Sequence, residues 1–258
     1  EGVAIASAIA QWVSAILIMI HLLHRKDCCR ICLHKLRFHR LASKRVLLIG
    51  VPSGLQNAIF AVANLFVQAG LNSFDEITVS GAAAAANADT LVFNMMAAFY
   101  TACASFVSRN WGAGRNDRIR KSYYISMLYA SIVGAVAGVL LLVLGRQFLG
   151  FFADKPEVID AGVDRLRIMA FSYFIAPLMD ASIAASRGLG RSVVPTVMVI
   201  IGSCVFRVVW IYTVFAFFHT ITSLYLLYIV SWIITGVAEA IYFRITYKKC
   251  VLQKTMTW

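Results

Sequence analysis

The sequence is poor in charged residues. Only 14% of its 258 residues are Asp, Glu, Lys or Arg, and the 12 acidic residues are outnumbered by 24 basic ones. Soluble domains have about 25% charged and about 45–50% apolar residues, whereas 60% of this chain is hydrophobic. The chain is too apolar to be disordered. It is also too apolar for a soluble nucleic-acid-binding protein, despite its net charge of +12. This composition predicts a membrane-embedded protein.

The strict alternation of apolar and polar residues that marks a transmembrane β-strand is also absent. Long apolar runs are present instead, and about 20 apolar residues are enough for a helix to cross a bilayer. We therefore predict an all-α, polytopic membrane protein with about seven transmembrane helices. The least marked boundary, between the last two runs, lies at His219 and Thr220. The seven runs are residues 2–23, 46–72, 78–106, 122–145, 158–184, 193–216 and 220–243.

Basic residues are distributed unevenly among the predicted loops. Nineteen of the 24 lie in four segments that alternate along the chain, as loops on one side of a membrane must: 24–45, 107–121, 187–191 and 244–254. Lys and Arg are enriched in cytoplasmic loops. We therefore predict a multi-pass protein of the plasma (inner) membrane, with residue 1 outside and Trp258 in the cytoplasm. The basic loops would then face the anionic headgroups of the membrane lipid.

The segment after the first run contains Cys28, Cys29 and Cys32 near several histidines. A zinc site is one interpretation, although adjacent cysteines do not match the spacing of a compact zinc finger. Palmitoylation of cysteines next to a membrane is a second interpretation. We favour free thiols in a reducing compartment, and the role of the three cysteines stays open. The nearby histidines are His21, His24, His34 and His39.

Charged residues inside predicted spans are expensive, at about 2.5–3.5 kcal/mol each on insertion scales. Asp89 lies in the middle of the third span, and we predict that it binds a cation, with a structural polar network as the alternative. For Asp180, late in the fifth span, a functional role and a pair with Arg187 are equally open. Arg207, in the middle of the sixth span, is predicted to be a structural partner, with a substrate contact as the alternative. We expect Glu239 to approach the cytoplasmic interface, where Arg244 neutralises it, with a functional role as the alternative.

Amide side chains are repeated along two predicted helices. Asn57 and Asn64 lie seven residues apart in the second span, and Asn87 and Asn94 do so in the third. Residues seven apart share one face of a helix. Hydrogen bonds between helices, worth about 0.6 kcal/mol each, are the alternative. We favour a water-filled cavity whose cation- or substrate-binding residues are these four amides with Asp89 and Asp180.

Prolines and glycines also lie at notable positions in the predicted spans. Pro52 opens the second span and Pro177 interrupts the fifth. Because proline removes a backbone hydrogen bond and kinks helices, we predict structural or gating roles for both, as for Arg187 and Arg207. Gly134 and Gly138 have the spacing of closely packed membrane helices.

Three stretches together resemble a known family. The chain resembles the second half of a multidrug and toxic compound extrusion (MATE) transporter. In one motif, Arg109 stands where the family usually has Gln. The stretches are Gly50-Val51-Pro52-Ser53-Gly54-Leu55-Gln56, Phe106-Val107-Ser108-Arg109-Asn110-Trp111-Gly112-Ala113-Gly114, and Arg187-Gly188-Leu189-Gly190-Arg191-Ser192 followed by Pro195 and Arg207-Val208-Val209-Trp210.

The resemblance implies an organisation. The family has two six-helix lobes around a central cavity. Residues 1–24 would be the helix that closes the first lobe, 25–45 a polybasic cytoplasmic linker, 46–247 the six-helix second lobe, and 248–258 a cytoplasmic tail. Since the chain starts at Glu1 without Met or a basic leader, we expect a longer protein whose N-terminal lobe is missing here.

The resemblance also implies a function. Family members export cationic, amphipathic drugs by antiport with sodium or protons, and some branches bind the cation through acidic residues of the second lobe. We expect the same here, with Asp89, Asn57 and Asn94 around the cation and the lobes rocking between two states of access. We expect no cofactor besides the coupling ion, no metal site, no nucleic-acid partner and no enzymatic activity. The expected partners are a cationic small molecule, membrane lipid and the missing lobe.

Three other functions fit the sequence less well. A lipid-linked oligosaccharide flippase of the same superfamily needs more basic residues in its cavity, and Arg207 is the only one predicted in the middle of a span. A seven-helix receptor lacks its retinal lysine and its Asp-Arg-Tyr and Asn-Pro-x-x-Tyr motifs. For a membrane enzyme there is no His-Glu-x-x-His motif, no Asp-rich phosphotransferase motif and no Ser/Lys dyad.

Overall fold

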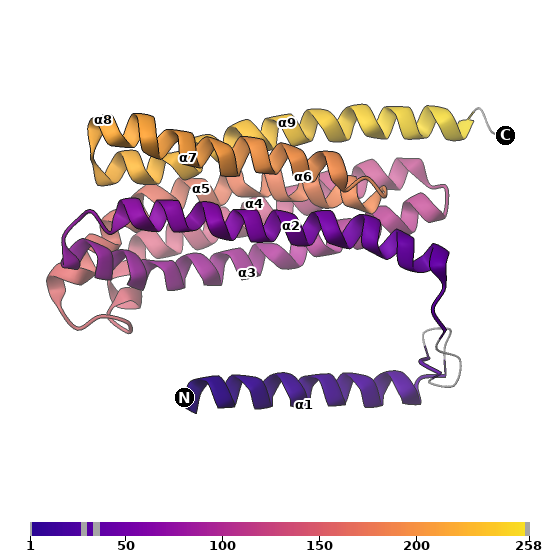
Figure 1. The fold of residues 1–258 in the computed structure, drawn as a ribbon, viewed down its shortest axis with the longest axis horizontal. Helices are drawn as coiled ribbons and strands as arrows, with labels where there is room; N and C mark the ends of the chain where they lie inside the picture. The colour runs from indigo at the N-terminus through magenta and orange to yellow at the C-terminus, as the bar shows by residue number, and fades with distance from the viewer. Residues whose placement is uncertain (1, 27–29, 33–36, 256–258) are drawn as a thin grey trace. The chain divides into compact units, whose positions relative to one another are not determined.

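The computed structural model describes residues 2–26, 30–32 and 37–255, and all regular elements in these ranges are helices (Figure 1). Seven helical segments in these ranges are long and apolar enough to cross a bilayer, which confirms the all-α prediction with seven spans. The elements are α1 (Gly2–His24), α2 (Arg40–Leu71), α3 (Glu76–Gly112), α4 (Asn116–Leu149), α5 (Pro156–Gly188), α6 (Val193–Val199), η2 (Ile200–Val205), α7 (Phe206–Trp210), η3 (Ile211–Phe215), α8 (Ala216–Phe218) and α9 (Ile221–Thr255).

The chain divides into two units, residues 1–45 and residues 46–258. The first unit is mainly α1, which is apolar all round. Its large side chains are exposed, with Trp12 at 71% and Leu17 at 61%. A helix that is hydrophobic on every side needs lipid or protein around it, so α1 has the surface of a membrane span.

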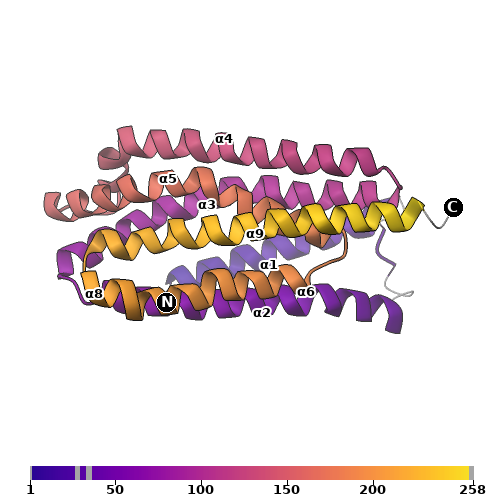
Figure 2. The ribbon, with the colours of Figure 1, turned by 90° about the horizontal axis from the view of Figure 1, so that it is seen from above.

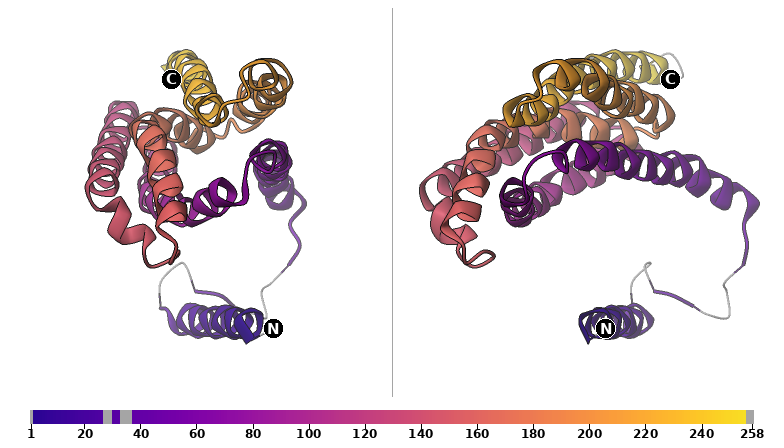
Figure 3. Two further views of the ribbon diagram at one scale, coloured as in Figure 1. Left: turned by 90° about the vertical axis from the view of Figure 1, so that its left-hand side faces the viewer. Right: turned by 60° about the vertical axis from the view of Figure 1, so that its left-hand side comes forward.

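The second unit is a helical bundle organised around α5. This helix packs against α3, α4 and α9, and α3 also packs against α4. The end-on views in Figure 3 show α4 beside α3 and α5, on the side of the bundle away from α6–α8. The main core cluster includes Met96, Leu166, Tyr173 and Leu224. The central position of α5 explains why it has the longest list of buried residues among these helices.

Glycines let α4 and α3 approach α5 closely. A Cβ atom on Gly134 would lie 2.2 Å from the carbonyl oxygen of Tyr173, and one on Gly81 would lie 2.6 Å from that of Val158. On Gly138 it would lie 3.0 Å from the carbonyl oxygen of Ala170. The small residues at these positions therefore serve helix packing, as the spacing of Gly134 and Gly138 predicts.

The sixth span is one continuous run of helical turns from Val193 to Phe218, in which two segments, η2 and η3, are π-helical. Neither segment contains a proline, and no other sequence signal predicts their wider, π-helical turns. The span ends at His219, whose φ of 44° is left-handed. This turn lies at the boundary that was the least marked in the sequence.

Both prolines of interest lie inside helices. Pro177 is buried in α5, which continues through it as one helix, and Pro52 lies in the first half of α2. Their predicted gating roles stay predictions.

The basic segments of the second unit share one end of the bundle. In Figures 1 and 2, the α3–α4 turn, the turn after α5 and the C-terminal end of α9 lie at that end. The α4–α5 loop and the α8–α9 turn lie at the other. The segments 107–121, 187–191 and 244–254 are thus placed as loops on one side of a membrane would be.

Candidate functional site

A cavity of about 310 Å³ lies within the second unit, between α2, α3, α5 and α9. Four aromatic side chains, two carboxyl groups and one guanidinium contribute to its wall. Most ligand sites are likewise apolar pockets with a few polar groups that fix orientation. The residues that line it are Phe60, Asn64, Asp89, Phe93, Arg165, Met169, Ala176, Met179, Asp180, Tyr228 and Trp232.

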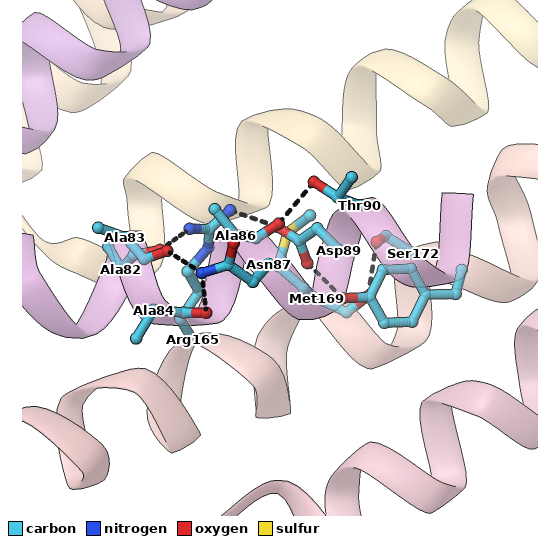
Figure 4. Close-up of polar contacts among 11 residues, drawn as sticks. Ala82, Ala83, Ala84, Ala86, Asn87, Asp89, Thr90, Arg165, Met169 and Ser172 are labelled. Atoms are coloured by element: carbon cyan, nitrogen blue, oxygen red, sulfur yellow. Dashed lines mark hydrogen bonds and ion pairs between the residues drawn. The ribbon is translucent and has the colours of Figure 1, made fainter. Parts of the chain in front are cut away.

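Asp89, in the cavity wall, is buried and already has two side-chain partners. Arg165 of α5 forms an ion pair with one carboxylate oxygen, and the Tyr173 hydroxyl donates a hydrogen bond to the other. Arg165 also donates to the carbonyl oxygen of Ala82, as Figure 4 shows. The charge of Asp89 is therefore compensated within the protein. This arrangement corresponds to the structural alternative that the sequence left open for Asp89.

Arg165 is a cavity residue that the sequence did not single out. It lies in the third helical turn of α5, close to the end of a span, where basic residues are common. Arg207 is the only basic residue predicted in the middle of a span, yet the basic residue that lines this cavity is Arg165. A long Arg side chain carries its charge several ångströms from its backbone, and only the packing of α3 against α5 shows that this one reaches Asp89.

Asp180 has the most available carboxyl group in the cavity. It lines the wall but forms no hydrogen bond or ion pair with another residue in the described part of the chain. Its electrostatic neighbours are Arg187, two turns later on α5, and Tyr100 of α3. Asp180 therefore combines access to the cavity with a charge that no direct partner satisfies.

Arg207 is fully buried between the two π-helical segments. One terminal nitrogen donates to Oδ1 of Asn64, at 2.8 Å. Its guanidinium carbon lies 4.4 Å from the ring centroid of Phe60 and 4.6 Å from that of Tyr228. The other two nitrogens have no hydrogen-bond partner among the described residues. The cation is thus held by aromatic faces and an amide rather than by an acid.

The predicted amide positions separate in the structure. Asn64 lines the cavity, whereas Asn87 donates to the carbonyl oxygens of Ala83 and Ala84 on its own helix (Figure 4). Asn57 and Asn94 are exposed and are not among the cavity-lining residues. The structure therefore brings together Asn64, Asp89 and Asp180 of the six predicted binding residues.

Two of the motif stretches contact each other at the end of the bundle that carries the basic segments. Arg187 donates to Oε1 of Gln56 at 2.8 Å, and Ser192 donates to the carbonyl oxygen of Leu48 at 2.9 Å. Both bonds join α2 to the end of α5 or to the turn that follows it.

Glu239 is placed differently from the expectation. Its side chain is 0% exposed, and its electrostatic partner is Arg187. Arg244 is exposed and points a terminal nitrogen at the hydroxyl of Tyr124, 3.5 Å away. The predicted neutralisation by Arg244 is therefore wrong, because Glu239 faces the bundle interior rather than the interface.

The described residues contain no group of three or more His, Cys, Asp or Glu side chains placed to hold a metal ion. Cys32 is exposed, whereas Cys28, Cys29 and His34 lie outside the described residues. The interpretations of this cysteine segment stay open.

Comparison with known proteins matches the MatE family model to residues 52–213. The probable multidrug resistance protein YpnP of Bacillus subtilis is 24% identical over 131 residues, which cover 51% of this chain and 29% of that protein. The probable multidrug resistance protein NorM of Thermotoga maritima is 21% identical over 169 residues, covering 62% and 34%. This chain thus spans about a third of its curated relatives.

The fold matches a solved structure of a MOP superfamily transporter from Pyrococcus furiosus. The TM-score is 0.86 at 16% identity, over 96% of this chain and 56% of that one. With the family model covering more than half of its residues, the chain belongs to the MatE family of multi-pass membrane proteins.

Proposed function

We propose that this chain supplies the second lobe of a secondary active transporter that exports cationic or amphipathic drugs in antiport with sodium or protons. One observation carries the proposal: Asp180 presents a carboxyl group, without a direct partner among the residues that the structure describes, to a cavity lined by aromatic side chains. Its relatives in Bacillus subtilis and Thermotoga maritima are named as probable multidrug resistance proteins, which supports the same function.

The chemistry of the cavity suits an organic cation. A carboxylate attracts the positive charge, and the faces of Phe60, Phe93 and Trp232 offer apolar surface and cation–π contact to the rest of the molecule. No side chain of the described residues forms a direct hydrogen bond to Asp180. The site therefore selects for charge and apolar surface more than for one hydrogen-bonding pattern, as a multidrug site requires.

Coupling follows from competition for one carboxylate. A sodium ion or proton at Asp180 removes the charge that holds the drug, and a bound drug excludes the ion. Alternating access arises when two lobes rock around such a site. The Asp89–Arg165 pair is internally neutral, so in this mechanism it positions α3 against α5 rather than binding the ion.

Ethidium, a cationic aromatic dye, tests the proposal with the whole purified protein. We expect the wild type to bind it and Asp180→Asn to lose at least tenfold in affinity, measured by dye fluorescence. Asp164→Asn is the matched control, because Asp164 is an exposed residue of the same helix, paired with Arg167. Equal affinity in wild type and Asp180→Asn would rule out Asp180 as the binding carboxylate.

An anionic substrate is the second candidate, consistent with a flippase for lipid-linked oligosaccharides. The specific observation is positive charge at the cavity: Arg165 lines it, and the buried Arg207 has no acidic partner among the described residues. The solved Pyrococcus furiosus transporter is described as having a binding pocket of reverse polarity that suggests a different function. Displacement of bound ethidium by another cationic drug, but not by a lipid pyrophosphate analogue, would favour a cationic substrate.

A further inference from the structure

Glu239 has a carboxyl group that the proposed cation site does not use. It lies on α9, is 0% exposed, and is absent from the cavity lining. Both of its carboxylate oxygens are buried without a hydrogen-bond partner among the described residues. Buried carboxylates without hydrogen bonds are strongly disfavoured, so this group needs a compensating charge or a proton.

Among the described residues, Arg187 is the charged side chain that acts electrostatically on Glu239. It lies seven residues after Asp180 on α5, about two helical turns. Because helical side chains lean toward the N-terminus of their helix, Arg187 extends back toward Asp180. The same guanidinium interacts electrostatically with Glu239 of α9, Asp180 of α5 and Tyr100 of α3.

The hydrogen bonds of Arg187 do not involve either carboxyl group, so its charge can balance Glu239 or Asp180. One terminal nitrogen donates to the neutral amide of Gln56 on α2, and Nε is buried without a partner among the described residues. Neither carboxyl group lies within ion-pair distance of it. The Arg187 guanidinium therefore interacts electrostatically with two carboxyl groups and forms an ion pair with neither of them.

The charge balance of this trio is the central point. With both carboxyl groups ionised, Arg187 leaves one negative charge uncompensated among buried groups, where uncompensated charge is expensive. With one carboxyl group protonated or bound to a cation, the trio is neutral. Neutrality of the trio therefore requires one further positive charge or proton besides Arg187.

We propose that Glu239 is a proton-binding site that exchanges its proton against cation binding at Asp180, with Arg187 as the shared counter-charge. When Asp180 is empty and ionised, it is balanced by Arg187 and Glu239 holds the proton. When a cation binds Asp180, Arg187 balances Glu239 instead. The O–H bond of Glu239 then breaks, its electron pair stays on the carboxylate, and the proton passes to water.

This inference rests on the proposed cation site, and it makes a prediction that the site alone does not. Cation binding at Asp180 releases a proton from a residue outside the cavity. The release is measured by calorimetry of ethidium binding to the whole protein in two buffers of different ionisation enthalpy. We expect the wild type to release a proton for each ethidium bound.

Variants distinguish the roles of the two carboxyl groups. Glu239→Gln should still bind ethidium but release no proton, because glutamine carries none to exchange. Glu157→Gln is the matched control: Glu157 is an exposed residue in the first turn of α5, and this variant should behave as the wild type. Unchanged proton release from Glu239→Gln would overturn the inference and leave the cation site intact. Failure of the wild type to bind ethidium would overturn both.

Infrared difference spectroscopy of the wild type gives a second test that does not depend on a variant folding. Ethidium binding should remove the band of a protonated carboxyl group in an apolar environment and add that of a carboxylate. If no such band is lost on binding, Glu239 does not hold the exchanged proton.

Discussion

At the scale of single residues, the membrane-embedded charges fall into different classes. Asp89 is paired with Arg165, Arg207 is surrounded by aromatic rings, and Asp180 and Glu239 have no direct partner in the described part of the chain. The sequence identified all of these except Arg165 as unusual, since charge inside a span is visible without a structure. The partners of Asp89 and Arg207 were not predictable, because they come from other helices.

Removing one member of the Asp89–Arg165 pair should destabilise the protein. Asp89→Asn removes the counter-charge of Arg165 and leaves its guanidinium largely buried, since the two side chains are only 11% and 12% exposed. Breaking a buried pair in this way costs about 3–5 kcal/mol. We expect a clearly lower melting temperature for Asp89→Asn and a smaller loss for the double variant with Arg165→Gln.

The exposed pair Asp164–Arg167 provides the comparison. Its side chains are 65% and 68% exposed, and surface pairs contribute at most about 1 kcal/mol. Asp164→Asn should therefore melt close to the wild type. A similar melting temperature for Asp89→Asn and Asp164→Asn would show that the buried pair is not a stabilising contact.

Asp75 gives a prediction on pH. It precedes α3 as its N-cap, and it accepts hydrogen bonds from the backbone N–H of Thr78 and from its hydroxyl, the latter at 2.6 Å. The hydroxyl bond, more than any other contact, lowers the pKa of Asp75 below its usual 3.8. A carboxyl group whose pKa is lowered by folding stabilises the folded state above its unfolded pKa.

Asp75→Ala should therefore melt below the wild type at neutral pH. The difference should shrink as the pH falls below about 4, through the lowered pKa of Asp75, where the wild type also loses its charged cap. Melting curves across this range test the prediction, with Asp154→Ala as an exposed control in the α4–α5 loop. A difference that is constant with pH would contradict the role assigned to the charged cap.

At the scale of helices, the sequence predicted the existence and order of the spans well, but it predicted the geometry within each helix poorly. Length and apolarity define a span, so all seven helices were recognisable, and the turn at His219 fell where the apolar pattern weakened. The π-helical segments around Arg207 were not predictable. They contain no proline, and a local widening of a helix is selected by packing rather than by residue type.

The close contact of α4 with α5 should be sensitive to a single methyl group. Gly134→Ala places its Cβ 2.2 Å from the carbonyl oxygen of Tyr173, so the two backbones must move apart. Overpacking of this kind costs about 1–3 kcal/mol or more. Gly112→Ala, where a Cβ meets nothing within 4 Å, is the matched control. Equal thermal stability of the two variants would contradict the packing.

At the scale of the whole molecule, the second unit is a helical bundle with its loops at two ends. Its basic segments share one end of the bundle, as the sequence predicted from their alternation (Figure 2). The cavity brings together α2, α3, α5 and α9, which are distant in sequence. For this reason the sequence named three of its lining residues, Asn64, Asp89 and Asp180, among six candidates, and missed Arg165 and the aromatic residues.

The orientation of the protein is testable by labelling. If the basic end is cytoplasmic, a cysteine introduced by Asp154→Cys in the α4–α5 loop should react with a membrane-impermeant maleimide on intact cells. A cysteine introduced by Arg115→Cys in the α3–α4 turn should react only after the membrane is permeabilised. Both variants are made in a cysteine-free background. The reverse pattern would invert the predicted topology.

Gradient-driven transport by the whole protein in proteoliposomes tests the central claim most directly. With a sodium or proton gradient imposed, the wild type and Asp164→Asn should accumulate ethidium against its concentration gradient. Asp180→Asn should leave the dye at equilibrium, because its cavity no longer carries the carboxylate for which ion and drug compete. Gradient-driven accumulation by Asp180→Asn at the wild-type rate would contradict the account.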